Sequence, residues 1–257
     1  MKVFITGASS GLGASLAREY ARRFTDCQLG LVARREPRLR ELAASLAPVP
    51  CQLYDVDVSD AEALRQAARA FVRDVGCPDV VIGNAGISRN TATGLVGDAA
   101  IFKRLVDVNV VALFNTFDAF VPAMREINAG TLVGIASVAG VRGLPGAGAY
   151  CASKAAVIGY LESLRLEMHK SPIAVVTIVP GFVRTEMTAV NTFPMPFLMD
   201  ADAFARRTVT AISAGRSLTY IPWQMGWLAR LLRLIPNAVF DRVFARIPQK
   251  PRAVDQS

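Results

Sequence analysis

The stretch Lys2-Val-Phe-Ile-Thr6-Gly7-Ala-Ser-Ser-Gly-Leu-Gly13 decides the fold of this chain. Its first five residues form a short apolar run that predicts a strand, and apolar residues at helical spacing follow from Leu12 to Phe24. Strand, glycine-rich turn and helix form the phosphate-binding unit of a dinucleotide fold, because glycines permit close backbone approach and a helix N-terminus offers N–H groups. The glycine spacing is T-G-x-x-x-G-x-G, and a structural loop without a ligand is the alternative.

The same alternation of strands and helices continues to residue 221. Amphipathic stretches such as 38–46, 61–75 and 101–127 predict helices between the apolar runs. We expect seven strands, at 2–6, 28–33, 49–56, 79–82, 131–136, 173–179 and 218–221. This pattern predicts a Rossmann-like α/β fold, a doubly wound parallel sheet with helices on both faces. No repeat or low-complexity linker divides residues 1–221, so we expect one dinucleotide-binding domain there, followed by an extension at 222–257.

The composition is that of a folded globular protein with an excess of positive charge. Apolar residues make up 52% of the 257 residues, charged residues 19%, and the net charge is +8. This charge raises nucleic acid and anionic membranes as partners, against the alternative of a basic protein that binds an anionic cofactor. No nucleic-acid recognition module is recognisable, so we expect no nucleic-acid partner. No apolar run reaches the ~18 residues of a membrane span.

Cysteine and histidine usage favours a protein without disulfides or metal. The four cysteines (Cys27, Cys51, Cys77 and Cys151) are scattered, and His169 is the only histidine. The paired spacing of a zinc site or a disulfide framework is absent from the sequence. We therefore expect reduced thiols, no metal site and a cytoplasmic location.

Two arginines, Arg34 and Arg35, follow the second predicted strand, where a dinucleotide fold meets the adenosine ribose. Arginine suits the 2′-phosphate of NADP, whereas an acidic residue would take the 2′-hydroxyl of NAD. Glu36 precedes Pro37 and is better explained as the start of the next helix. The sequence therefore favours NADP(H) over NAD(H), and solvated arginines at a strand end are the alternative.

Other candidate residues also follow strand ends. Asp57-Val58 ends the third strand, where adenine would lie, although Asp57 could instead cap a helix. The small-residue turn Asn84-Ala85-Gly86 follows the fourth strand, and Pro180-Gly181 closes the sixth. The carboxyl ends of parallel strands meet at one edge of a sheet, so these residues are expected to converge on one ligand.

Tyr150 and Lys154 are the candidate acid–base pair. Residues at i and i+4 lie on one helix face, and an ammonium beside a phenol lowers its pKa from ~10. Ser137, at the end of the fifth strand, could offer its hydroxyl to the same oxygen; an ordinary surface pair is the alternative for Tyr150 and Lys154. Asn109 interrupts an apolar helical stretch, and it needs either a functional role or a purely structural hydrogen-bonding one.

These ordered motifs, from Lys2 to about Thr188, resemble the short-chain dehydrogenase/reductase family in its single-domain form. The resemblance implies a seven-stranded sheet of order 3-2-1-4-5-6-7. By position, Tyr150 would be the proton donor or acceptor, Lys154 would hold the nicotinamide ribose and Ser137 would orient the substrate oxygen. Asn109 would anchor a water in a proton relay toward Lys154. A small departure is Gly83, where the family often has asparagine.

The same resemblance places a nicotinamide cofactor along the strand ends. Thr185 would contact the carboxamide. The cofactor-binding residues expected are Gly7, Ser9, Ser10, Gly11, Leu12, Gly13, Arg34, Arg35, Asp57, Val58, Asn84, Ala85, Gly86, Tyr150, Lys154, Pro180, Gly181, Val183 and Thr185. The expected function is an NADP(H)-dependent oxidoreductase that interconverts a carbonyl and an alcohol by hydride transfer. A catalytically idle NADP(H)-binding regulator is the alternative, and a homodimer or homotetramer is expected.

Two segments lie outside this simple pattern. The family's substrate lid falls at about 186–214, and its apolar start (186–199) suggests an apolar substrate. The extension 222–257 predicts two short amphipathic helices broken at Pro236, with six basic and two acidic residues, a net +4. It is expected to cap the pocket or form a subunit contact, and membrane binding is the alternative.

Overall fold

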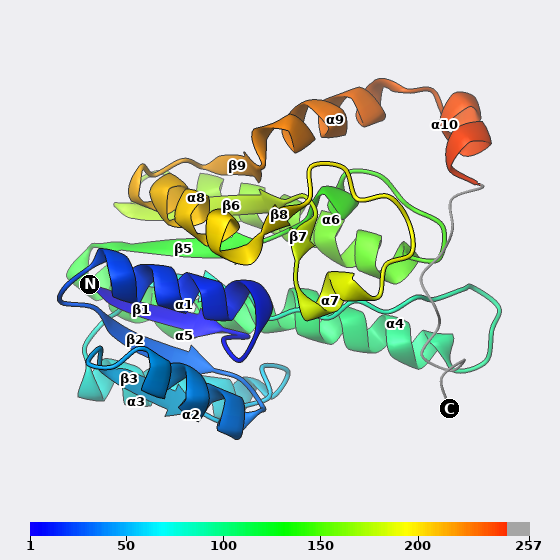
Figure 1. Ribbon diagram of the computed structural model, residues 1–257. Helices are drawn as coiled ribbons and strands as arrows, with labels where there is room; N and C mark the ends of the chain where they lie inside the picture. The colour runs from blue at the N-terminus through cyan, green and yellow to red at the C-terminus, as the bar shows by residue number, and fades with distance from the viewer. Residues whose placement is uncertain (246–257) are drawn as a thin grey trace.

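One parallel sheet of seven strands organises the computed structural model, which describes residues 1–245 (Figure 1). The strand order is β3-β2-β1-β4-β5-β6-β9, with every neighbouring pair parallel. The strands are β1 (Lys2–Thr6), β2 (Gln28–Val32), β3 (Cys51–Tyr54), β4 (Val80–Gly83), β5 (Gly130–Ile135), β6 (Ile173–Pro180) and β9 (Leu218–Ile221). The expected order is confirmed, with β9 as the seventh strand because the short β7 (Val183–Arg184) and β8 (Met199–Asp200) pair separately.

Helices cover both faces of the sheet and create two cores. In Figure 1 the near face carries α1 (Gly11–Arg23), α2 (Glu36–Ser45) and α8 (Ala201–Ser213). The far face carries α3 (Ala61–Asp74), α5 (Ala112–Ile127) and α6 (Gly148–Glu167). In β1, Val3 and Ile5 enter the first core, whereas Phe4 enters the second. Strand side chains alternate between faces, so a strand covered on both sides must be apolar throughout.

The predicted interruption at Asn109 is a turn of π-helix. Residues 98–127 are helical, as α4 (Asp98–Val106), the π-turn η1 (Asp107–Val111) and α5. These 30 residues are long and apolar enough to cross a membrane by length and composition, contrary to the sequence expectation. Core helices meet the same criterion, and here Phe117 and Phe120 are fully buried against the sheet.

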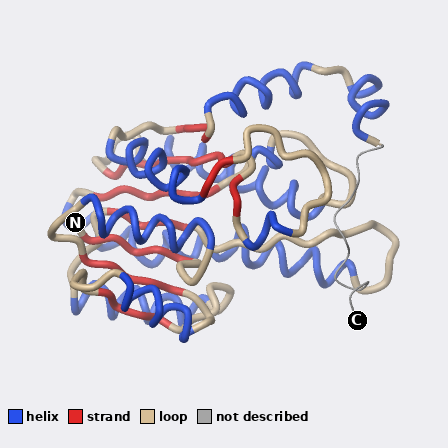
Figure 2. Tube along the Cα trace, viewed as in Figure 1, coloured by secondary structure: helices blue, strands red, loops and turns tan. Residues whose placement is uncertain are grey.

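The segment expected to be a lid divides into two parts. Residues 186–200 form α7 (Glu186–Ala189), a loop and β8, over the carboxyl ends of the strands (Figure 2). Residues 201–213 form α8, which buries Phe204, Val209 and Ile212 in the first core and packs on α1. The helix α8 is thus part of the core that covers the sheet. The lid hypothesis is therefore restricted to residues 186–200.

Two helices follow β9, as the sequence predicts. They are α9 (Trp223–Leu234) and α10 (Asn237–Phe244), separated at Pro236. The Arg142 guanidinium donates hydrogen bonds to the carbonyl oxygens of Leu232 (2.7 Å) and Ile235 (2.9 Å) and to Oδ1 of Asn237 (2.9 Å). This side chain joins both helices to the loop that precedes α6. The predicted tail residues Arg246, Ile247, Lys250, Arg252 and Asp255 lie outside the described residues.

Candidate active site

The glycine-rich turn brings β1, α1 and the end of β4 into close contact. Gly7 has a positive φ of 69°, and a Cβ there would lie 2.8 Å from the Cα of Ala85. A Cβ on Gly13 would collide with the Gly7 carbonyl. The Asn84 side chain donates to the carbonyl oxygens of Thr6 (2.9 Å) and Gly7 (3.2 Å). These glycines are therefore required by the turn itself, and Asn84 holds the two strand ends together.

The N-terminus of α1 has the features of an anion site. Its N-cap residue, Ser10, makes no side-chain capping bond, and the first turn contains no acidic residue. The Ser10 hydroxyl instead accepts a 2.7 Å hydrogen bond from Arg35, which also donates to the Ser9 hydroxyl at 3.1 Å. First-turn N–H groups without a side-chain cap, beside a guanidinium, suit a phosphate group. The residues present therefore fit the phosphates of a dinucleotide.

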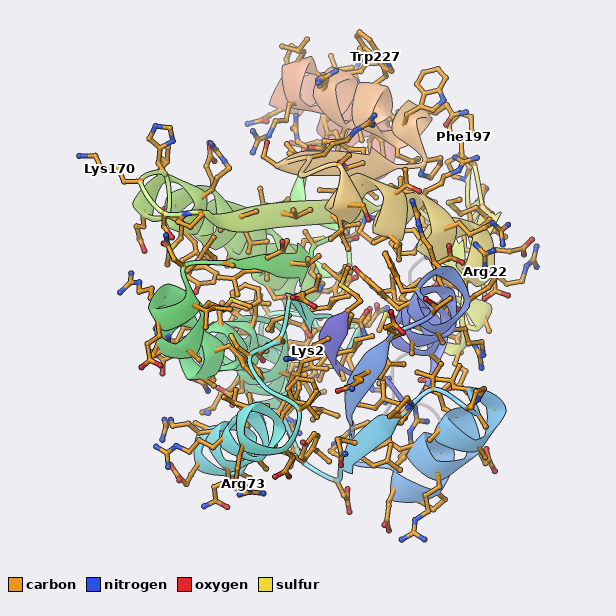
Figure 3. All side chains as sticks on the ribbon, turned by 90° about the vertical axis from the view of Figure 1, so that its left-hand side faces the viewer. Lys2, Arg22, Arg73, Lys170, Phe197 and Trp227 are labelled. Atoms are coloured by element: carbon orange, nitrogen blue, oxygen red, sulfur yellow. The ribbon has the colours of Figure 1, made fainter. Side chains whose placement is uncertain are left out.

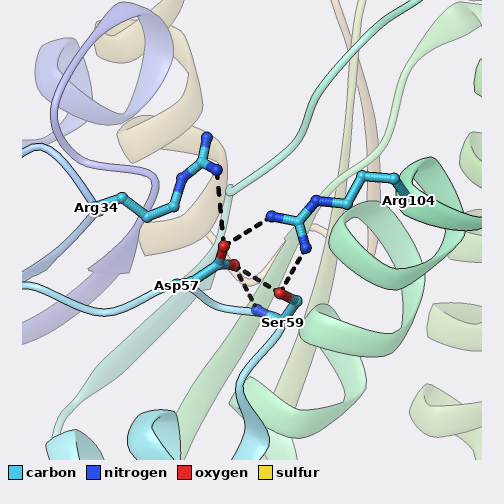
Figure 4. Close-up of polar contacts among 4 residues, drawn as sticks. All are labelled: Arg34, Asp57, Ser59 and Arg104. Carbon is cyan, nitrogen blue, oxygen red and sulfur yellow. Dashed lines mark hydrogen bonds and ion pairs between the residues drawn. The ribbon is translucent and has the colours of Figure 1, made fainter. Parts of the chain in front are cut away.

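Asp57 lies at the centre of a second polar cluster (Figure 4). Its carboxylate accepts hydrogen bonds from Arg104 (2.7 Å) and from the Ser59 hydroxyl (2.7 Å) and amide (3.0 Å), and Arg34 lies 3.6 Å away. Burial would raise the pKa of Asp57, but the bonds from Ser59 and Arg104 lower it to about 2. Arg34 therefore faces a carboxylate. Sequence reasoning missed Arg104 because it comes from a helix 47 residues away.

The lid helix α7 joins this edge through Glu186. Its carboxylate lies 2.6 Å from Nη1 of Arg38 and 3.6 Å from Nη1 of Arg35. The hydrogen bond from Arg38 lowers the pKa of Glu186. Three arginines, at 34, 35 and 38, thus line the end of β2 and the start of α2. Arg38 is an addition to the two that the sequence predicts.

Lys154 and Asn109 converge on Gly86. The Lys154 ammonium, with 5% of the residue exposed, donates to the Ile135 carbonyl at 2.8 Å. A Cβ on Gly86 would lie 3.3 Å from Oδ1 of Asn109 and 3.6 Å from Nζ of Lys154. A side chain at position 86 would therefore crowd the space beside Asn109 and Lys154.

The Asn109 side chain is fully engaged by the protein. It accepts from the Ile87 amide (2.8 Å) and donates to the Ile87 carbonyl (3.0 Å) and the Ser153 hydroxyl (2.9 Å). The π-turn positions the side chain for this double contact with the loop after β4 and with α6. Asn109 therefore has a structural role, and its water relay stays a prediction.

Tyr150 and Ser137 lie at the start of α6 and the end of β5. Tyr150 is half-buried, and Ser137 is buried while accepting from the Ala139 amide at 3.2 Å. Burial raises the pKa of the Tyr150 phenol, and a hydrogen bond with the Ser137 hydroxyl acts in the opposite direction. Burial also lowers the pKa of Lys154 to about 8. The expected lowering of the Tyr150 pKa is not found, because removal from water outweighs the hydrogen bond with Ser137, and the Lys154 ammonium lies 6.0 Å from the ring centroid.

The other expected cofactor residues occupy the same edge. Thr185 caps α7 with Thr188, and its methyl would be 3.5 Å from a Cβ on Gly11, so lid and glycine turn meet there. Gly181 packs against Met225 of α9. Val58, Pro180 and Val183 are buried and Leu12 is partly buried.

The departure at Gly83 has a local reason. A Cβ at this position would collide with Cδ1 of Leu113, a buried side chain of α5. Leu113 fills the space that a larger residue would need.

Comparison with known proteins finds oxidoreductases and short-chain dehydrogenases. A family model described as short chain dehydrogenase matches residues 1–193. An uncharacterized oxidoreductase of Myxococcus xanthus is 37% identical over 245 residues, which cover 95% of this chain and 96% of that protein. A short-chain dehydrogenase from Sphingobium yanoikuyae in complex with NADPH is 28% identical, with a TM-score of 0.78 and coverage of 100% and 99%. A short-chain dehydrogenase/reductase from Burkholderia phymatum in complex with NAD is 23% identical and matches in fold, with a TM-score of 0.81 and coverage of 98% and 97%.

Proposed function

Because the chain belongs to the short-chain dehydrogenase/reductase family, and is therefore an oxidoreductase, we propose that it interconverts a carbonyl and an alcohol with NADP(H). One observation carries the proposal. Tyr150, Ser137 and Lys154 lie together at the carboxyl end of β5, and Lys154 also lies beside Gly86, on the same edge as the glycine-rich turn. In doubly wound sheets, ligands bind at this edge.

A nicotinamide cofactor supplies or accepts the hydride when it is bound. The side chains of the protein then have to transfer one proton and hold the substrate oxygen in place. In the reductive direction the Tyr150 hydroxyl donates its proton to the substrate oxygen, and in the oxidative direction the phenolate accepts it. Ser137 holds that oxygen by a hydrogen bond. With a pKa of about 8, Lys154 is largely protonated at pH 7, so its ammonium stabilises the phenolate that proton donation leaves behind.

The arginines at 34, 35 and 38 support a preference for the 2′-phosphorylated cofactor. All three lie at the end of β2 or the start of α2, and Arg35 reaches the serines of the glycine turn. A planar guanidinium binds a phosphate with two parallel hydrogen bonds, so a cluster of three favours NADP(H) over NAD(H). The solved relatives hold NADPH in one case and NAD in another, so the proposed preference depends on the arginines.

The lid supports an apolar substrate. Met187, Val190 and Phe197 of residues 186–200 are all exposed large apolar side chains. A lid that closes over a substrate contributes these side chains to the walls of the pocket.

We also propose a homodimer or homotetramer built on α4, α5 and α6. Phe102, Val111, Phe114 and Leu166 are exposed apolar residues of this helical layer. Pairing between copies would bury them. Sedimentation of the wild type and of Phe114→Glu tests this: the charged variant should dissociate to a smaller species.

The direct test is a panel of aldehydes, ketones and alcohols assayed with NADPH, NADH and both oxidised forms. We expect turnover of apolar substrates and a higher kcat/KM with NADPH than with NADH. A preference for NADH would contradict the role of the arginines. Cofactor binding without turnover of any substrate would favour the regulator instead.

A further inference from the structure

The helix α9 is attached to the molecule through Met225 and two small residues. Its buried residues are Met225, Gly226 and Ala229. A Cβ on Gly226 would lie only 3.1 Å from the Tyr220 ring, so the helix backbone approaches β9 closely at this position. Four other large apolar side chains of α9 point away from the body of the molecule.

Those large side chains form one exposed apolar stripe. The exposed fractions are 64% for Trp223, 63% for Trp227, 58% for Leu231 and 80% for Leu234. The spacing of four, four and three residues keeps them on one face of the helix. Figure 3 shows Trp227 pointing outward at the margin of the molecule. Such an apolar face is usually buried, but in this structure it is exposed to solvent.

The helix α10 adds two exposed apolar side chains beyond Pro236. Val239 and Val243 are exposed, whereas Phe240 is buried beneath the Arg142 guanidinium, 4.0 Å from its ring centroid. Arg142 also binds the carbonyl oxygens at the end of α9, which fixes both helices to the same loop. The exposed side chains at 223, 227, 231, 234, 239 and 243 are called the apolar stripe below.

Basic residues accompany the apolar stripe. Among residues 222–245 there are three arginines (Arg230, Arg233, Arg242) and one acidic residue (Asp241), a net charge of 3 − 1 = +2. The sequence of α9 contains no acidic residue, and the Arg230 guanidinium lies 5.2 Å from the Trp227 ring centroid. Tryptophan and arginine beside exposed leucines are typical of helices that lie in a bilayer interface.

We propose that the apolar stripe is a docking surface for an anionic lipid bilayer. The tryptophans and leucines would enter the boundary between head groups and acyl chains, and the arginines would face the anionic head groups. A second copy of the chain is a less favourable occupant, because a two-fold symmetric contact would bring the arginines of both copies together. The lid loop lies below α9 in Figure 1, so a docked molecule would hold its lid near the membrane.

The two tryptophans provide a direct test. Trp223 and Trp227 are the only tryptophans of the chain, so its indole fluorescence reports on α9 alone. Full-length protein is titrated with vesicles of phosphatidylcholine containing phosphatidylglycerol, and separately with pure phosphatidylcholine. We expect a blue shift and quenching by brominated lipids with the anionic vesicles, and weaker binding at high salt.

Three variants separate the contributions of the stripe. Leu231→Gln/Leu234→Gln keeps both reporters and should weaken binding at least about tenfold. Arg233→Gln/Arg242→Gln should weaken binding to anionic vesicles by about 25-fold, since each basic residue contributes about fivefold at an anionic surface. Leu95→Gln/Val96→Gln is the matched control, because both residues are exposed and apolar but lie elsewhere; it should bind like the wild type.

Two results would overturn the proposal. The first is an indole spectrum that vesicles of either composition leave unchanged. The second is a blue shift that grows with protein concentration in the absence of lipid and disappears, together with a dimer, in Leu231→Gln/Leu234→Gln. That result would identify a second copy as the occupant. Neither measurement requires a known substrate, so the outcome is independent of the proposed reaction.

Discussion

The carboxylate of Glu186 accepts a 2.6 Å hydrogen bond from Nη1 of Arg38, which ties the first helix of the lid to α2. Arg35 lies 3.6 Å from the same carboxylate and also binds the serines of the glycine turn. A 2′-phosphate at these arginines would meet Glu186 as a competing anion. On the proposed function, this one side chain would link cofactor choice to the position of the lid.

Glu186→Gln should strengthen NADPH binding and leave NADH binding nearly unchanged. The ion pairs are largely exposed, so the gain should not exceed about fivefold. Titration of cofactor fluorescence measures both dissociation constants. Arg38→Gln is the opposing variant and should weaken NADPH binding. Equal changes for NADPH and NADH would mean that Glu186 acts on the lid alone.

Tyr150→Phe should lower kcat at least about 10²-fold, because the proton donor is lost, while cofactor affinity stays close to the wild-type value. Tyr160→Phe is the matched control, since Tyr160 is a half-buried tyrosine of the same helix. Steady-state kinetics with an active substrate of the panel checks both. Full activity of Tyr150→Phe would refute the assignment.

Asn109→Ala should destabilise the protein by about 2–4 kcal/mol, because both backbone groups of Ile87 and the Ser153 hydroxyl lose a buried partner. Urea unfolding measures this, with the half-buried Asn115→Ala as control. The same variant tests the proposed relay. If kcat at low temperature equals that of the wild type, Asn109 has only the structural role.

Asp57→Asn should cost stability at pH 7 and much less at acid pH. The folded pKa of about 2 lies below the ordinary value of 3.8, so the ionised carboxylate contributes stability above about pH 4. That contribution is lost as the pH falls toward 2. The side chain is one-third exposed, so about 1 kcal/mol is expected at pH 7. Urea unfolding from pH 7 to pH 3 measures it, with the exposed Asp55→Asn as control. A loss of stability that does not change with pH would mean that Asp57 acts through packing and not through its charge.

Much of the fold and of the site's composition could be predicted from local sequence. Apolar runs buried on both faces predict the strands, and the glycine spacing predicts the turn, because these signals depend on near neighbours in the chain. The break at Asn109 was also predicted from its context. Its partners Ile87 and Ser153 were not, since they come from two other elements.

Ionic partners were decided by packing. Arg104 reaches Asp57 and Arg38 reaches Glu186 across 47 and 148 residues, so no local pattern announces either pair. The pKa of Tyr150 also depends on burial, which the spacing of Tyr150 and Lys154 leaves open. The residue types could be predicted from local sequence. Their ionic partners and pKa values depend on tertiary contacts.

The extension after residue 221 shows most clearly what local sequence determines and what tertiary packing determines. The sequence by itself determined two amphipathic helices and the break at Pro236, because periodicity and proline act locally. It did not determine which face of α9 would be covered. In the structure the face with Met225, Gly226 and Ala229 is buried, since Gly226 lets the helix backbone come close to Tyr220, and the tryptophans are left outside. Which face of α9 is buried depends on the shape of the surface beneath the helix, because protein interiors are closely packed.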